Sequence, residues 1–163
     1  MSTALQLDPT PPRRASQLWR PVILATGFQD DALEMLVFWF SDIADHPSEP
    51  ILIVSGAQSG LPQSVDQLGL VAQIRTCPNS HFVKWADHAD IFTVGAGGYD
   101  PSYRPPCPMI AVAARDGRAQ LGIDGFCAQT GEEWRDVVRA MLDDPALCLA
   151  LSPRREIPEN KPI

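Results

Sequence analysis

Short apolar runs that alternate with helical segments constrain the fold of this chain more than any other feature of its sequence. The runs lie at residues 22–26, 51–54, 71–74, 91–94 and 109–113, with a shorter one at Phe126 and Cys127. Apolar runs without alternation are typical of strands buried on both faces of a parallel sheet. The sequence therefore predicts an α/β fold, a Rossmann-like three-layer sandwich with a mainly parallel sheet of five to six strands.

The segments between these runs show helical periodicity. It predicts helices at residues 32–44, 63–68 and 80–89, then one after Thr130 and another from Pro145. Thr130 and Glu133 have the spacing of a capping box. Asp31 and Glu34 have similar spacing, and Ser80 is a candidate cap for the third helix.

The first predicted helix is more apolar than one buried face requires. Met35, Phe38 and Trp39 widen its apolar surface beyond a single stripe. A helix that is apolar nearly all round is either deeply buried or faces a second partner. We therefore take Met35, Phe38 and Trp39 as candidate partner-binding residues.

Proline marks the ends of the chain, with 16 prolines among 163 residues. The pattern predicts a Pro-rich arm at residues 1–20, disordered or partner-bound, a single α/β domain at 21–151 and a Pro-rich tail at 152–163. In the arm, Arg13 and Arg14 are candidate partner contacts, with a solvated tail as the alternative.

Charge and composition exclude several classes of partner. A formal charge of −7 and a pI near 4.8 argue against nucleic acid and anionic membranes. The longest apolar run, residues 35–40, is far shorter than the ~20 residues of a membrane span, so no transmembrane segment is expected. The four cysteines form no C-x-x-C pair, and the beginning of the chain has no signal-peptide pattern. These features predict a cytoplasmic protein with its cysteines in the core.

A glycine-rich segment after the fourth apolar run is the strongest local candidate for chemistry. Gly95, Gly97 and Gly98, followed by Tyr99, can present backbone N–H groups to an anion, or simply make a tight turn. Arginines in the following segments can bind a phosphate, with solvated loop positions as the alternative: Arg104, Arg115 and Arg118.

Other catalytic patterns are missing from the sequence. His46, His81 and His88 have no set of neighbouring ligands that identifies a metal site. No serine lies in a G-x-S-x-G motif, and there is no Walker A or H-E-x-x-H motif. The sequence therefore assigns no catalytic residue, no metal and no cofactor.

Two stretches resemble a known family. Residues 86–99 (ADHADIFTVGAGGY) and 122–151 (GIDGFC to LCLAL) resemble the C-terminal, donor-binding half of two-domain nucleotide-sugar glycosyltransferases. Residues 21–56 fit the start of such a half. The resemblance implies a possible nucleotide-sugar ligand and these contacts: Gly95, Gly97, Gly98 and Tyr99 at the diphosphate, and Arg115, Arg118 and Gln120 at the phosphate or sugar.

The chain also departs from that family. Residues 101–108 (PSYRPPCP) replace a helix, and the glutamate that holds the donor ribose in the family is missing. The family's chemistry takes place between two halves, and this chain corresponds to one. The sequence therefore favours a degenerate, non-catalytic subunit that acts in a larger assembly with another protein chain. The alternative is a nucleotide-sugar-binding subunit of a split glycosyltransferase, with a separate acceptor-binding chain.

Overall fold

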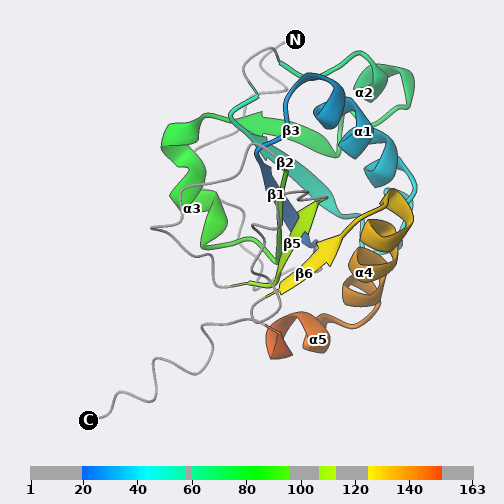
Figure 1. Cartoon of the computed structure of the whole chain (residues 1–163), viewed down its shortest axis with the longest axis vertical. Coiled ribbons are helices and arrows are strands. Elements are labelled where there is room, and N and C mark those ends of the chain that lie inside the picture. The colour runs from blue at the N-terminus through cyan, green and yellow to red at the C-terminus, as the bar shows by residue number, and fades with distance from the viewer. Residues whose placement is uncertain (1–19, 58–59, 96–106, 113–124, 152–163) are drawn as a thin grey trace.

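Six strands form one sheet in the computed structural model, which describes residues 20–57, 60–95, 107–112 and 125–151 (Figure 1). Their order is β3-β2-β1-β4-β5-β6, and every pairing is parallel. The strands are β1 (Val22–Thr26), β2 (Ile51–Ser55), β3 (Ile74–Cys77), β4 (Ile91–Val94), β5 (Met109–Val112) and β6 (Gly125–Ala128). The predicted parallel sheet of five to six strands is confirmed.

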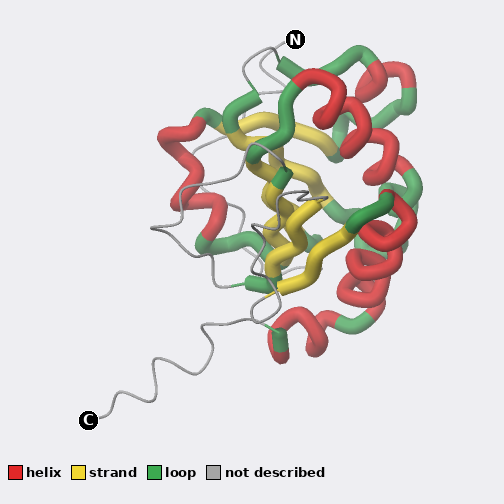
Figure 2. Tube along the Cα trace, in the orientation of Figure 1, coloured by secondary structure: helices red, strands yellow, loops and turns green. Residues whose placement is uncertain are grey.

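Helices cover both faces of the sheet (Figures 1 and 2). One face carries α1 (Asp30–Ser41), α2 (Ser64–Gln67), α4 (Gly131–Asp143) and α5 (Pro145–Ala150). The other carries α3 (Phe82–Ala86), which follows the 3-10 helix η2 (Asn79–His81). This arrangement confirms the three-layer, Rossmann-like architecture.

The apolar runs divide their side chains between two cores. Leu24 pairs with Ile53 and Phe92, and this row packs on the α3 side. Ile23 pairs with Leu52 and Ile91, and that row packs under α1 and α4. Because successive side chains of a strand point to opposite faces, a strand buried on both faces must be apolar at every position.

The third strand differs from its prediction. β3 begins at Ile74, where the predicted run of residues 71–74 ends. Val71 lies in the preceding turn and is 37% exposed. Gln73 is held outside the strand, because its side-chain amide donates to the carbonyls of Ala44 and Pro50. β3 is an edge strand whose middle residues, Arg75 and Thr76, are only half-buried, so its sequence lacks a continuous apolar signal.

Two predicted helix caps are wrong. The N-cap of α1 is Gln29, and no side chain caps the helix. The backbone carbonyl of Gln29 already accepts bonds from Ala32 and Leu33, which places Asp31 inside the first turn. Ser80 lies within η2, so the predicted 80–89 helix is split between η2 and the five-residue α3.

The capping box of α4 is confirmed. The Thr130 hydroxyl accepts a 3.1 Å bond from the Glu133 backbone N–H. The Glu133 carboxylate in turn accepts a 2.7 Å bond from the backbone N–H of Gln129. These bonds satisfy donors that the start of a helix leaves open.

The elements from β1 to α5 fall within the predicted domain at 21–151. The predicted arm and tail lie outside the described residues, apart from Arg20. Arg20 donates from Nε to the backbone carbonyl of Glu49. None of the helices in the described part of the chain is both long and apolar enough to cross a membrane.

Candidate functional site

The carboxyl ends of four neighbouring strands meet at one edge of the sheet. β1 lies between β2 and β4, and β3 flanks β2, all in parallel. The segments that follow these strands begin at Gly27, Gly56, Pro78 and Gly95. Ligands of open α/β sheets bind at this edge, so we take it as the candidate site.

Gly95, the first residue of the glycine-rich segment, packs against the backbone that follows β1. Its N–H donates a 2.9 Å bond to the carbonyl of Thr26. A Cβ at Gly95 would lie 2.5 Å from the carbonyl oxygen of Gly27 and 2.9 Å from Phe28 Cδ1. Only glycine fits this contact, so Gly95 has a packing role at the edge. Gly27 itself has φ of +84°, a conformation that favours glycine.

Polar side chains form a second feature of this edge, which we call the edge cluster: Gln29, Ser55, Gly56 and Asn79. The buried Ser55 hydroxyl donates a 3.1 Å bond to Asn79 Oδ1. Gln29 Nε2 donates a 2.8 Å bond to the carbonyl of Gly56. A Cβ at Gly56 would lie 2.7 Å from Asn79 Oδ1, and its φ is +76°. The edge cluster therefore joins the ends of β1, β2 and β3 by neutral hydrogen bonds.

Sequence analysis missed the edge cluster. Its members lie after β1, at the end of β2 and in η2, and no local motif connects them. The sequence offered only the position of these residues as a signal, because each lies at or after the end of a predicted strand. Amide and hydroxyl groups of this kind suit recognition of neutral polar groups on a ligand.

The remaining candidate ligand contacts lie outside the described residues. They are Gly97, Gly98, Tyr99, Arg104, Arg115, Arg118 and Gln120. Arg13 and Arg14 of the candidate partner contacts also lie outside them. These assignments stay predictions.

The partner candidates on α1 divide into two kinds. Met35 and Phe38 point away from the core and are 36% and 48% exposed. Trp39 packs against Trp134 of α4, with ring centroids 5.9 Å apart. A side chain at Gly131 would overlap the Trp39 indole, so glycine at the start of α4 makes room for it. Trp39 thus joins α1 to α4, while Met35 and Phe38 face solvent.

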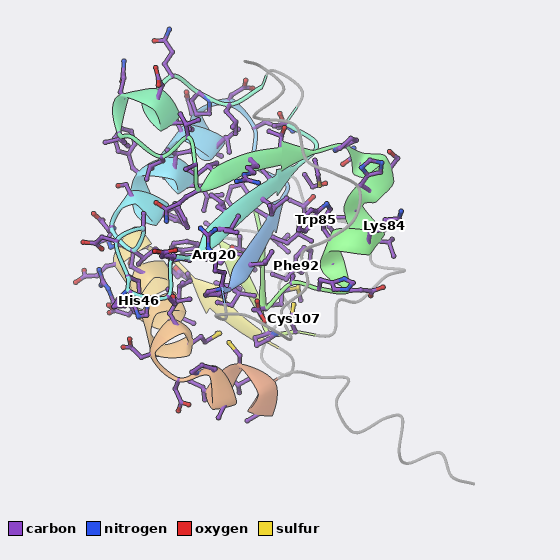
Figure 3. All side chains as sticks on the ribbon, turned by 180° about the vertical axis from the view of Figure 1, so that it is seen from behind. Arg20, His46, Lys84, Trp85, Phe92 and Cys107 are labelled. Atoms are coloured by element: carbon purple, nitrogen blue, oxygen red, sulfur yellow. The ribbon has the colours of Figure 1, made fainter. Side chains whose placement is uncertain are left out.

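His46 lies apart from the edge cluster, whereas His81 belongs to η2 together with Asn79. His46 Nε2 lies 2.7 Å from Asp143 Oδ1 of α4, and His46 Nδ1 lies 2.8 Å from Ser48 Oγ. Figure 3 shows His46 beside α4, across the molecule from Lys84 and Trp85 of α3. Within the described ranges, no three His, Cys, Asp or Glu side chains are grouped to hold a metal ion.

Among the described residues, the groups whose pKa values are clearly shifted are buried cysteine thiols. Burial raises the pKa of Cys77 to about 11, although a hydrogen bond with Ser55 lowers it. Burial and nearby Asp90 raise the pKa of Cys148 to about 12 and that of Cys107 further still. All three are free cysteines that stay protonated near neutral pH, as core residues rather than thiolate nucleophiles.

The fold has a counterpart among solved structures. The chain is similar to the C-terminal domain of a glycosyl transferase group 1 family protein, LpcC, from Francisella tularensis, with a TM-score of 0.62 and 15% identity. The match covers 93% of this chain and 92% of that domain. The glycosyltransferase GlyE of Streptococcus pneumoniae also matches, at a TM-score of 0.49 and 14% identity, over 79% of this chain and 34% of GlyE.

By sequence alone, no protein-family model and no curated protein matches this chain. At 15% identity, the likeness to the LpcC domain concerns the fold. The chain therefore has the fold of a glycosyltransferase C-terminal domain, as the resemblance of residues 86–99 and 122–151 implies.

Proposed function

We propose that this chain is a degenerate, non-catalytic glycosyltransferase-like subunit that acts as an interaction component of a larger assembly. The observation that carries the proposal is the exposure of Met35 and Phe38 on α1. Large apolar side chains that neighbour one another on the surface mark sites of protein association. Arg13 and Arg14 are proposed as further contacts with the partner chain.

The chemistry of the sheet edge supports a non-catalytic role. The polar groups of the edge cluster bond to one another: Gln29 to the carbonyl of Gly56, and Ser55 to Asn79. Gly95, the first residue of the candidate phosphate-binding loop, is buried against Gly27. Gln29, Ser55 and Asn79 thus already use hydrogen-bonding groups within the chain, which suits a scaffold, since fold alone does not determine function.

Co-purification tests the proposal. The tagged full chain is expressed in its native cells beside a Met35→Ser/Phe38→Ser variant. We expect one chain to co-purify stoichiometrically with the wild type and to be lost from the variant. Val83→Ser is the matched control, because Val83 is 50% exposed on α3, on the opposite face of the sheet. A monomer in all three preparations would overturn the proposal.

A second candidate is a nucleotide-sugar-binding subunit of a split glycosyltransferase, working with a separate acceptor-binding chain. The shared fold with the LpcC domain favours it, as does the meeting of the segments after β1 and β4 at the ligand-binding edge. The proposed contacts are Gly95, Gly97, Gly98, Tyr99, Arg104, Arg115, Arg118 and Gln120.

Thermal unfolding with uridine nucleotides distinguishes this second candidate. A ligand at 100 times its Kd stabilises the folded state by about 2.7 kcal/mol and raises Tm. Binding through the arginines predicts that Arg115→Ala/Arg118→Ala removes this shift. No shift with any nucleotide sugar at millimolar concentration would exclude the second candidate.

We also propose a cytoplasmic location. Cys77, Cys107 and Cys148 are buried free thiols, which is typical of reducing compartments. Alkylation of thiols in intact cells at the time of lysis, followed by mass spectrometry, tests this assignment. Oxidised cysteines in the freshly trapped protein would contradict it.

A further inference from the structure

The solvent side of α1 carries a mixed acidic and apolar row, which we call the α1 stripe: Asp31, Met35, Phe38 and Asp42. Spacings of four, three and four residues align these positions along one side of a helix. All four residues are exposed, whereas Leu33, Leu36, Val37 and Phe40 of the same segment are buried. The stripe therefore runs along the side of α1 opposite the core.

α1 exposes more large apolar surface than its neighbour α4. α4 is of similar length and lies beside α1, yet among the described residues it exposes no large apolar side chain. Next to α1 on its other side, α2 is followed by two more exposed apolar residues, Leu68 and Val71. Among the described residues, four of the six exposed large apolar side chains lie on α1 or just after α2, and the other two are Val83 on α3 and Leu151 after α5. Figure 1 shows α1 and α2 next to each other on one side of the sheet.

The charged side chains of α1 itself are all acidic. α1 contains Asp30, Asp31 and Glu34 and has no lysine or arginine in its sequence. The cations closest along α4 are already engaged, since Arg135 pairs with the Asp42 carboxylate at 3.1 Å and Arg139 donates to the Asp42 carbonyl. Any protein that covers Met35 and Phe38 therefore approaches acidic side chains at the Asp31 end of the α1 stripe, whereas Arg135 offsets the charge of Asp42 at the other end.

We propose that the α1 stripe binds a basic amphipathic segment of another protein. Its apolar residues cover Met35 and Phe38, and its lysines or arginines approach Asp31 and Glu34. The inference rests on the proposed function, because it names the chemistry of the partner. A second copy of this chain fits less well, since a two-fold contact through the stripe places acidic groups opposite acidic groups.

Two synthetic peptides test this chemistry with the full chain. The probe is an 18-residue Lys/Leu amphipathic helix, and the charge control is its Glu/Leu counterpart. We expect the Lys/Leu peptide to bind in fluorescence anisotropy and the Glu/Leu peptide not to bind. Met35→Ser/Phe38→Ser is expected to weaken binding at least about tenfold, which corresponds to about 1.4 kcal/mol, because it removes two large apolar side chains from the contact.

Matched variants locate the site. Asp31→Asn/Glu34→Gln is expected to weaken binding about threefold to tenfold at low salt and to have less effect at high salt. Val83→Ser on α3 is expected to leave binding unchanged. Circular dichroism and urea unfolding confirm that each variant is folded before binding is measured.

Three results would overturn the inference. The first is equal binding of both peptides, and the second is binding that Met35→Ser/Phe38→Ser leaves unchanged. The third is concentration-dependent self-association that the same variant removes, which would identify a second copy as the occupant. If the Lys/Leu peptide fails to bind but co-purification still depends on Met35 and Phe38, the basic partner is wrong while the proposed function stands.

Discussion

Trp134 donates a 3.0 Å hydrogen bond from its indole Nε1 to Thr93 Oγ1, and both side chains are fully buried. The Thr93 hydroxyl in turn donates a hydrogen bond to the backbone carbonyl of Ile110, 3.1 Å away. This chain of bonds connects α4 to β4 and β5 inside the apolar core. Such a network is worth most when every member is satisfied, because an unpaired polar group in a low-dielectric core is costly.

Removing both partners of this bond is expected to cost less than the sum of the costs of removing each alone. Trp134→Phe deletes the donor, and Thr93→Val leaves the indole N–H buried without an acceptor, each at about 1–3 kcal/mol of unfolding free energy. The double variant is expected to lose less than the sum of the two. Urea unfolding of the four proteins gives the coupling energy. Additive losses would show that the bond contributes nothing to stability.

The close approach of Gly95 to Gly27 predicts a steric penalty at the sheet edge. Gly95→Ala places a methyl group 2.5 Å from a backbone oxygen that cannot rotate away, so we expect a loss of about 1–3 kcal/mol. Gly60→Ala is the control, because open space surrounds Gly60 and only its φ of +83° opposes a side chain. That change is expected to cost about 1–2 kcal/mol. Unfolding by urea measures both, and a Gly95→Ala variant as stable as the wild type would show that the contact with Gly27 imposes no steric penalty.

Parts of this architecture were predictable because they depend on local pattern. Continuous apolar runs identify strands buried on both faces, and Thr130 with Glu133 marks the start of α4. The edge strand β3 was misplaced because Arg75 and Thr76 are half-buried and interrupt the apolar signal. The exposure of a side chain also depends on residues that are far away in the sequence. Gly131 leaves room for the Trp39 indole, which packs against Trp134 of α4. No residue near Trp39 in the sequence predicts this contact.

The edge cluster was not predictable for a related reason. Gln29 and Asn79 follow β1 and β3, Ser55 ends β2, and only the order β3-β2-β1 brings them together. Each is an ordinary polar residue at a strand end when taken alone. Prediction of such a site requires the strand order, which alternating apolar runs do not determine.

The buried thiols predict a loss of stability at alkaline pH. The pKa of Cys77 is raised from 9.0 to about 11, so the folded state keeps a proton that the unfolded chain releases. The stabilising contribution is therefore fully present below pH 9 and decreases as the pH rises toward 11. We expect the unfolding free energy to fall more steeply over this range in the wild type than in Cys77→Ala. Identical slopes in a pH series of urea unfolding would contradict the raised pKa.

His46 joins the turn after α1 to the end of α4, and its hydrogen bonds identify its tautomer. The Ser48 backbone N–H donates to His46 Nδ1 at 3.1 Å, so this nitrogen is an acceptor. The neutral ring then carries its proton on Nε2, which donates to Asp143 Oδ1 at 2.7 Å. Nitrogen-15 NMR is expected to show the Nε2–H tautomer in the wild type.

Two variants of Asp143 test the contact with His46. Asp143→Asn keeps an acceptor, whereas Asp143→Ala removes it at a cost of up to about 1 kcal/mol of unfolding free energy, a modest loss because this aspartate is 68% exposed. Equal stability of the two variants, or an Nδ1–H tautomer, would show that this contact does not hold α4 in place.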